Sequence, residues 1–280
     1  MKRIVVTGAK GGAGKSLVGV LQERGYDVVG IDLHAWTAED SLGYVQLDLR
    51  NAEGVNDVFA GADGVIHFGS PPADVWFSTT EAFHMVAVAG FNVFQAAKNV
   101  GIERIAWASS IEVYGDFTSH PSLPVTEESP LAPPGIYGCS KILLERLAED
   151  YCRWHGMCIA GFRLSRIIYD SDSGRAKLKS LVEDEGMGKD CLWSYIDARD
   201  VGAACIAWLE ADHQGAEVFN LAAKNVHQEV GMADLLKRHG YEGFSVPALD
   251  ALDDTLFSTA KIRAMLGWKE QYDWREILLS

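Results

Sequence analysis

Short apolar runs rich in Val and Ile recur along most of the chain, and segments with helical spacing separate most of them. The runs lie at residues 2–7, 27–32, 44–49, 64–69, 104–110, 158–165 and 217–222. They are continuous and do not alternate with polar residues, which is typical of strands covered on both faces. Such strands alternating with helices predict an α/β fold with a mainly parallel, doubly wound sheet.

Two segments have long helical patterns, Thr80–Asn99 and Cys139–His155. Apolar residues surround nearly the whole circumference of the first segment, so we expect it to be buried on more than one side. One of its faces is therefore predicted to meet a second subunit.

The alternation of strands and helices is interrupted after Tyr169 by the polar stretch DSDSGRAKLKS. We therefore predict a sheet domain over residues 1–168 and a small C-terminal substrate-binding lobe over residues 169–280. The late strand at 217–222 would return to the sheet, so the lobe and the sheet domain are interleaved.

The chain has 280 residues and a formal net charge of −14 at pH 7. This charge argues against nucleic acid or an anionic membrane as a partner, because both would repel it. Five cysteines, an odd number without C-x-x-C pairs, indicate neither a disulfide framework nor a metal site. No apolar run is long enough to cross a bilayer, and none resembles a targeting segment. These features predict a soluble, cytoplasmic protein.

The segment Val6–Ser16, VTGAKGGAGKS, fits two kinds of phosphate-binding loop. One is the dinucleotide turn T-G-x-x-G-x-x-G, with Gly8, Gly11 and Gly14 as its glycines. The other is the variant P-loop of partition ATPases, KGGAGKS. Both place glycines where a phosphate approaches backbone N–H groups at a helix N-terminus. Asp32 has the spacing of the acidic residue that binds the adenosine ribose in dinucleotide sites, which favours the first interpretation.

Two segments further along the chain decide between these loops: ASSIEVYG at residues 108–115 and PPGIYGCSK at residues 133–141. With them, the sequence strongly resembles the extended short-chain dehydrogenase/reductases, the NAD-dependent epimerase/dehydratase family. The resemblance covers residues 1 to about 200. The matching positions are Thr7 and Gly8 with Gly11 and Gly14, Asp32, Asp48 and Leu49, Ser110, Glu127–Pro133, Tyr137 and Lys141.

The resemblance implies a dinucleotide-binding (Rossmann) domain over residues 1–168 with Ser110, Tyr137 and Lys141 as its catalytic group. Tyr137 and Lys141, four residues apart, project from one helix face. A lysine ammonium beside the phenol would lower the pKa of Tyr137 from its usual value of about 10, making it a general acid or base. Ser110 would donate a hydrogen bond to the reacting oxygen. Lys141 would also hold the nicotinamide ribose.

The same resemblance implies NAD as the cofactor. The residues that would bind it are Gly8, Gly11, Gly14, Asp32, Asp48, Leu49 and Lys141. Asp32 without an adjacent arginine favours NAD over NADP, because its carboxylate would repel a 2′-phosphate. Lys10 in the glycine turn either meets that phosphate or is a solvated loop lysine. Asp48 either meets the adenine amino group or caps its own loop.

Several positions depart from the family pattern and narrow the substrate. Ile111 replaces an aspartate that sugar-nucleotide dehydratases use, so Glu112 lacks its acidic partner and elimination of water is disfavoured. Arg166 replaces an asparagine that contacts the substrate diphosphate. It would either grip a carboxylate or phosphate or form an ion pair at the lobe. Ser70 is a candidate substrate contact near the nicotinamide, and His67 is expected to be a core histidine hydrogen-bonded to the backbone.

These observations predict an NAD(H)-dependent oxidoreductase that transfers hydride at a hydroxyl or carbonyl carbon of a small sugar, sugar acid or polyol. The segments HFGSPP and GGAG resemble uronate dehydrogenases within the family, although those carry Asn-His where this chain has Ile111 and Glu112. The alternative is an NAD-dependent sugar or nucleotide-sugar epimerase. A catalytically inactive cofactor-sensing protein and a P-loop ATPase are less favoured. The family resemblance also implies a homodimer built from the two long helices.

Overall fold

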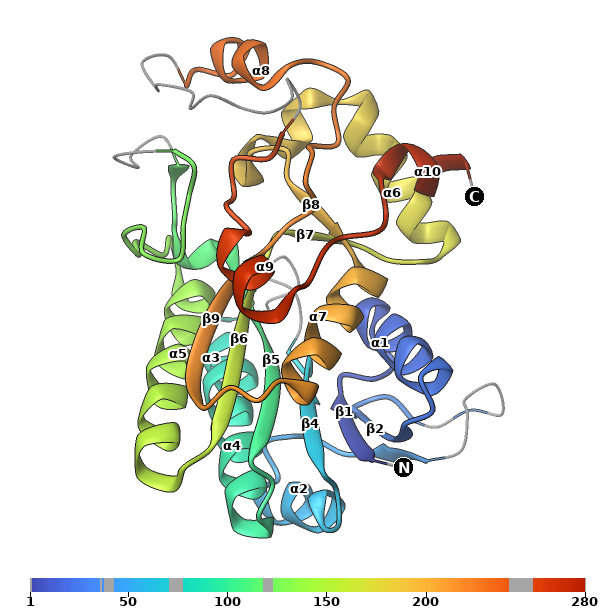
Figure 1. The fold of residues 1–280 in the computed structure, drawn as a ribbon, viewed down its shortest axis with the longest axis vertical. Helices are drawn as coiled ribbons and strands as arrows, with labels where there is room; N and C mark the ends of the chain where they lie inside the picture. The colour runs from blue at the N-terminus through green and yellow to red at the C-terminus, as the bar shows by residue number, and fades with distance from the viewer. Residues whose placement is uncertain are drawn as a thin grey trace.

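The chain folds around a seven-stranded sheet in which every strand runs parallel to its neighbours (Figure 1). The computed structural model describes residues 2–35, 37, 43–70, 78–117, 123–241 and 254–279. The strands, in their order across the sheet, are β3 (Tyr44–Gln46), β2 (Asp27–Asp32), β1 (Arg3–Thr7), β4 (Gly64–His67), β5 (Arg104–Ser110), β6 (Cys158–Leu164) and β9 (Gly215–Leu221). The predicted doubly wound parallel sheet is thus confirmed, and all seven apolar runs contribute a strand.

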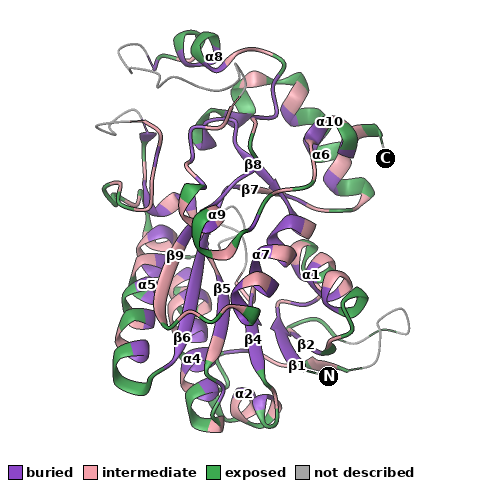
Figure 2. Ribbon diagram, in the orientation of Figure 1, coloured by how far each residue is buried: buried purple, intermediate pink, exposed green. Residues whose placement is uncertain are grey.

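Helices cover both faces of this sheet, which is why its strands are apolar without alternation. The covering helices are α1 (Gly12–Glu23) and α7 (Ala198–Glu210) on one face, and α2 (Ala52–Phe59), α4 (Ala89–Val100) and α5 (Ile136–His155) on the other. Neighbouring residues of β1 belong to different cores. Val6 packs with the residues of α1 and α7, whereas Val5 packs with those of α2, α4 and α5. In Figure 2 the inner strands are accordingly mostly buried, and the exposed residues lie on the helices and on the connecting loops.

The two long helices are present, with differences from the predicted segments. The first is helical throughout but not regular: α3 (Thr79–Phe83) continues through a π-helical turn, η2 (His84–Val88), into α4. The second, α5, begins at Ile136 and not at Cys139, so Tyr137 lies in its first turn. Gly138 lies within this first turn, where a Cβ would lie 2.8 Å from the carbonyl oxygen of Glu112. This glycine permits close packing and does not interrupt the helix.

A smaller layer lies beyond the carboxyl ends of the sheet strands (Figure 1). It contains a parallel pair, β7 (Arg166–Ile168) and β8 (Tyr195–Asp197), together with α6 (Asp172–Glu183), η5 (Glu185–Cys191), α8 (Met232–Arg238) and α10 (Trp274–Leu279). The chain returns from this layer to the sheet through α7 and β9, and α9 (Ala260–Leu266) packs near β9. The domain boundary after residue 168 stays a prediction. No helix in the described part of the chain is long and apolar enough to cross a membrane.

Candidate active site

The glycine turn after β1 closes so tightly that two of its glycines have no room for a side chain. Gly8 has φ +71°, and a Cβ on it would lie 2.4 Å from the carbonyl oxygen of Phe68. A Cβ on Gly14 would lie only 2.0 Å from the carbonyl oxygen of Gly8. The Gly11 N–H donates to that same Gly8 oxygen at 3.0 Å. The turn therefore brings the start of α1 directly over the carboxyl end of β1.

Asp32, at the end of β2, is fixed against the glycine turn. One carboxylate oxygen accepts a hydrogen bond from the backbone N–H of Lys10 at 2.9 Å, and the other accepts from the backbone N–H of His34 at 3.0 Å. Burial opposes the ionisation of Asp32, but hydrogen bonds from His34 and Lys10 outweigh it and lower the pKa of the carboxyl. The Lys10 ammonium donates to the carbonyl oxygen of Ala35 at 2.6 Å. Asp32 is thus a positioned anion beside the turn.

Asp48 caps its own loop. Its carboxylate accepts from the backbone N–H of Arg50 at 2.9 Å and pairs with the Arg50 guanidinium at 2.5 Å. Leu49 is buried, and its carbonyl oxygen accepts from the side-chain amide of Asn92 at 2.9 Å. The adenine contacts predicted for Asp48 and Leu49 stay predictions. Sequence reasoning missed Asn92, which ties this loop to α4.

The predicted catalytic residues come together at the carboxyl end of β5. The hydroxyl of Ser110 and the side chain of Tyr137 are hydrogen-bonded to each other. The buried Lys141 ammonium donates to the carbonyl oxygen of Ala108 at 2.6 Å and to the hydroxyl of Ser70 at 3.0 Å. Its nitrogen lies 5.2 Å from the centre of the Tyr137 ring. The structure therefore unites Ser70, which follows β4, with the three predicted catalytic side chains.

The expected lowering of the pKa of Tyr137 by Lys141 is wrong for this arrangement. Burial raises the pKa of Tyr137, and the negative charge of Glu112 raises it further, whereas the hydrogen bond with Ser110 opposes the rise. Burial also lowers the pKa of Lys141 to about 7. Lys141 does not offset these effects: its ammonium is directed to Ala108 and Ser70 and lies beside the phenol ring. Burial consequently opposes the charged form of both groups.

Comparison with known proteins decides the family. The model of the NAD dependent epimerase/dehydratase family matches residues 4–222. A uronate dehydrogenase of Agrobacterium fabrum is 34% identical over 77% of this chain and 82% of its own length. The chain belongs to the NAD-dependent epimerase/dehydratase family.

Two further comparisons extend the similarity to most of the chain. An L-arabinose 1-dehydrogenase (NAD(P)(+)) of Haloferax volcanii is 27% identical over 86% of this chain and 96% of its own length. The solved structure of MoeE5 in complex with UDP-glucuronic acid and NAD superposes with a TM-score of 0.76 at 21% identity, covering 99% of this chain and 96% of that one. That structure shows the same fold, including the lobe.

The glycine turn fits the NAD of this family. The first N–H groups of α1 donate to no capping side chain, because its N-cap is Gly11. A helix N-terminus of this kind attracts the phosphates of a dinucleotide. Lys15 and Ser16, which suggested a P-loop, lie within α1, where the Ser16 hydroxyl donates to the carbonyl oxygen of Gly12 at 3.4 Å. Family membership therefore overturns the ATPase interpretation.

The other predicted substrate residues are in two places. Ile111 is buried in the 3-10 turn η3 (Ile111–Val113), which Ser110 caps by accepting from the backbone N–H of Glu112 at 3.2 Å. The charge of Glu112 raises the pKa values of Tyr137 and Lys141, so its carboxylate belongs to the site's electrostatics. Arg166 instead pairs with Asp190 of the lobe at 3.0 Å. Of the two alternatives given for Arg166, the structure shows the ion pair at the lobe.

His67 is a core histidine, as predicted, but its hydrogen-bond partner differs from the expected one, and Tyr169 makes a contact that was not predicted. His67 is buried, but its Nδ1 lies 2.7 Å from the hydroxyl of Thr7, so the expectation of a backbone partner was wrong. Burial lowers the pKa of His67 to about 3, which keeps its ring neutral. Tyr169 reaches from the lobe to the glycine turn, where a Cβ on Gly12 would lie 2.5 Å from its ring. The sequence identified Tyr169 only as a boundary and carried no signal for this contact.

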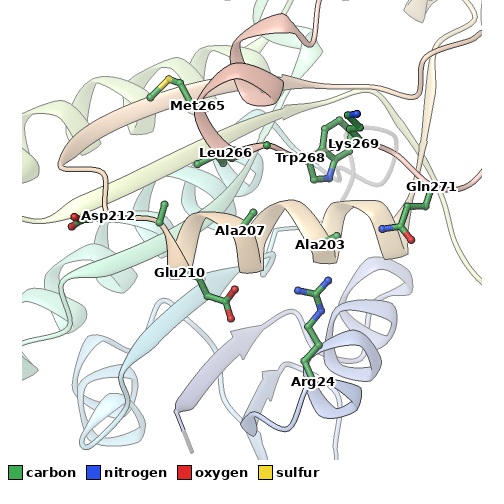
Figure 3. Close-up of a pocket in the computed structure, with 12 residues that line it drawn as sticks. Arg24, Ala203, Ala207, Glu210, Asp212, Met265, Leu266, Trp268, Lys269 and Gln271 are labelled. Carbon is green, nitrogen blue, oxygen red and sulfur yellow. The ribbon is translucent and has the colours of Figure 1, made fainter.

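Two grooves lie outside this cluster. One, of about 540 Å³, follows α1 and is lined by Lys15, Tyr169 and Arg199 among others. The other, of about 480 Å³, lies along the outer side of α7 and is drawn in Figure 3. Arg24, Glu210 and Lys269 line this second groove, so its charges have both signs. Neither groove includes Ser110, Tyr137 or Lys141.

Proposed function

We propose that this protein is an NAD(H)-dependent dehydrogenase that transfers hydride at a hydroxyl or carbonyl carbon of a small sugar, sugar acid or polyol. The observation that carries the proposal is the meeting of Ser110, Tyr137 and Lys141 at the end of β5. This cluster and the glycine turn after β1 both lie at the carboxyl edge of one parallel sheet, where α/β folds bind dinucleotides.

The cofactor would be held by the glycine turn and by charged groups around it. Gly11 and Gly14 would let the phosphates approach the N-terminus of α1, and Asp32 would accept hydrogen bonds from the adenosine ribose. Lys141 would donate to the nicotinamide ribose. NAD, when bound, supplies the hydride acceptor or donor. The anionic Asp32 supports a preference for NAD over NADP.

Tyr137 would move the proton that accompanies hydride transfer. In substrate oxidation its hydroxyl oxygen, as the phenolate, would accept the proton of the substrate hydroxyl. In reduction the neutral phenol would donate that proton to the carbonyl oxygen. Ser110 would donate a hydrogen bond to the same substrate oxygen and stabilise its developing charge. The neutral phenol favoured by burial is the form ready for reduction.

A sugar acid is the substrate class that we favour. Uronate dehydrogenase and L-arabinose 1-dehydrogenase are relatives that act on small sugars or their acids, as their names state. Arg166 supports an acid, because its side chain remains 26% exposed and its partner Asp190 is 70% exposed. An exposed carboxylate partner can be exchanged for a substrate carboxylate at modest cost.

The test is a panel of sugar acids, aldoses and nucleotide sugars with NAD⁺ or NADP⁺, followed by absorbance at 340 nm. We expect steady NADH formation with at least one sugar acid and slower turnover with NADP⁺. Arg166→Met should raise KM for sugar acids about tenfold or more and leave KM for aldoses unchanged, since a charged hydrogen bond contributes about 1.5–3 kcal/mol. Arg146→Met, an exposed change on α5, is the control.

Other outcomes of this panel would contradict the proposal. Interconversion of sugar epimers without release of NADH would establish an epimerase instead. Equal effects of Arg166→Met on acids and aldoses would exclude Arg166 as the carboxylate contact. A protein that neither binds NAD nor turns over any substrate of the panel would contradict both the dehydrogenase and the epimerase.

We further propose a homodimer formed by α4 and α5. These helices pack side by side and expose Phe91 (43%), Leu143 (48%) and Trp154 (53%). A contiguous group of large apolar side chains on a protein surface commonly marks an interface, and we propose that these three side chains form one. The double variant Phe91→Glu/Leu143→Glu should be monomeric in light scattering after gel filtration. Met265→Glu, an exposed change on α9, should leave the dimer intact, and a monomeric unmodified protein would contradict the proposal.

A cytoplasmic setting and the absence of nucleic-acid or membrane partners also remain proposals. All five cysteines lie in the described part of the chain and are free thiols, which supports a reducing compartment. The net charge of −14 disfavours polyanionic partners.

A further inference from the structure

The end of β5 holds three side chains of α5 that lie one helical turn apart. These are Tyr137, Lys141 and Glu145, which share one helix face because they are spaced by four residues. Ser110 bonds to Tyr137, the carbonyl oxygen of Ala108 accepts from Lys141, and the Ser109 hydroxyl donates to Glu145 at 2.6 Å. Glu145 is therefore an acidic residue on the same helix face as the predicted catalytic residues Tyr137 and Lys141. The proposed proton transfer gives Glu145 no role.

Glu145 is fixed in position by a buried arginine. Arg163, near the carboxyl end of β6, donates from Nε to one carboxylate oxygen at 3.0 Å and from a terminal nitrogen to the other at 2.7 Å. The side chains of Arg163 and Glu145 are only 4% and 7% exposed. Arg163 also donates to the hydroxyl of Tyr114 and to the carbonyl oxygen of Glu127, both at 2.9 Å. These bonds fix the Glu145 carboxylate on the helix face that carries Lys141, one turn away.

The titratable groups around Lys141 come from three elements. Glu145 lies on α5 itself, Glu112 on η3, and the neutral His67 on β4. Burial lowers the pKa of Lys141, and among the charges that oppose this Glu145 has the largest effect, followed by Glu112. Arg163, on β6, is the cation that faces Glu145.

We propose that Glu145 is a positioning residue that keeps Lys141 protonated and fastens α5 to the end of β5. One part of this proposal, the effect on NAD affinity, rests on the proposed function, in which the Lys141 ammonium binds the nicotinamide ribose. A buried ion pair with a purely structural role would also join α5 to β6, but its removal would leave the protonation of Lys141 unchanged. The protonation state of Lys141 is therefore the quantity to measure.

The experiment follows Lys141 by NMR through the pH dependence of its 13Cε chemical shift, assigned with Lys141→Arg. Glu145→Gln alone leaves Arg163 buried and unpaired, which is destabilising. The double variant Glu145→Gln/Arg163→Met removes both charges and keeps the fold testable. Glu149→Gln, one turn further along α5 and exposed, is the matched control.

We expect the double variant to lower the titration midpoint of Lys141 by about one pH unit or more, since a nearby opposite charge shifts a pKa by that amount. Glu149→Gln should not lower it. The pH above which NAD affinity falls should move down in parallel. An unchanged Lys141 midpoint in the folded double variant would overturn the proposal. A shifted midpoint with no NAD binding by any variant, including the unmodified protein, would instead contradict the proposed function.

Discussion

Replacing Tyr137 with phenylalanine is expected to reduce kcat about 100- to 10,000-fold, because the site loses its proton-transfer group. The ring remains in place and only the hydroxyl, with its bond to Ser110, is removed. NAD affinity and thermal stability should therefore change little. The measurements are steady-state NADH formation with an accepted substrate and calorimetric titration with NAD.

The matched control is Tyr151→Phe on the same helix. The Tyr151 hydroxyl donates to Gln95 at 2.7 Å, far along α5 from the cluster at its first turn. This change removes the same atom and the same kind of hydrogen bond without touching the site, so kcat should stay within about twofold of the unmodified enzyme. Equal turnover of the two variants on every accepted substrate would exclude Tyr137 as the general acid or base.

The fold could be predicted from the sequence because its signals are local. Continuous apolar runs identified all seven sheet strands, and the glycine spacing identified the turn after β1. The start of α5 was predicted too late in the chain, and the close approach of Gly138 to Glu112 within its first turn cannot be read from the sequence. The π-helical turn at His84–Val88 likewise has no local sequence signal that we recognise.

The residues of the candidate site could be predicted from the sequence, but the pKa of Tyr137 could not. Family motifs identified Ser110, Tyr137 and Lys141, whose meeting the structure shows. The pKa of Tyr137 depends on burial and on the direction of the Lys141 ammonium, and neither can be read from spacing. One missed signal was available: Arg163 stands in an apolar strand, and a buried arginine requires an acidic partner.

The glycine turn gives the second large expected effect, through Gly14→Ala. A Cβ on Gly14 would lie 2.0 Å from the carbonyl oxygen of Gly8 and 2.8 Å from the Cα of Ala9. Both are backbone atoms, so the turn itself must shift. We expect a loss of about 1–3 kcal/mol of stability and a 10- to 100-fold weaker affinity for NAD, because the start of α1 moves away from the phosphates.

Two other glycines of α1, changed to alanine in the same way, are the comparison for Gly14→Ala. Gly19→Ala adds the same methyl group where no atom lies within 4 Å, so it should raise stability by about 0.5–1 kcal/mol and leave NAD affinity unchanged. At Gly12 the methyl group would meet the Tyr169 ring, a side chain that can rotate, and not backbone. Gly12→Ala should therefore fall between the other two in thermal unfolding and in NAD titration. If Gly14→Ala bound NAD as tightly as Gly19→Ala does, the close contact between Gly14 and Gly8 would not be what shapes the cofactor site.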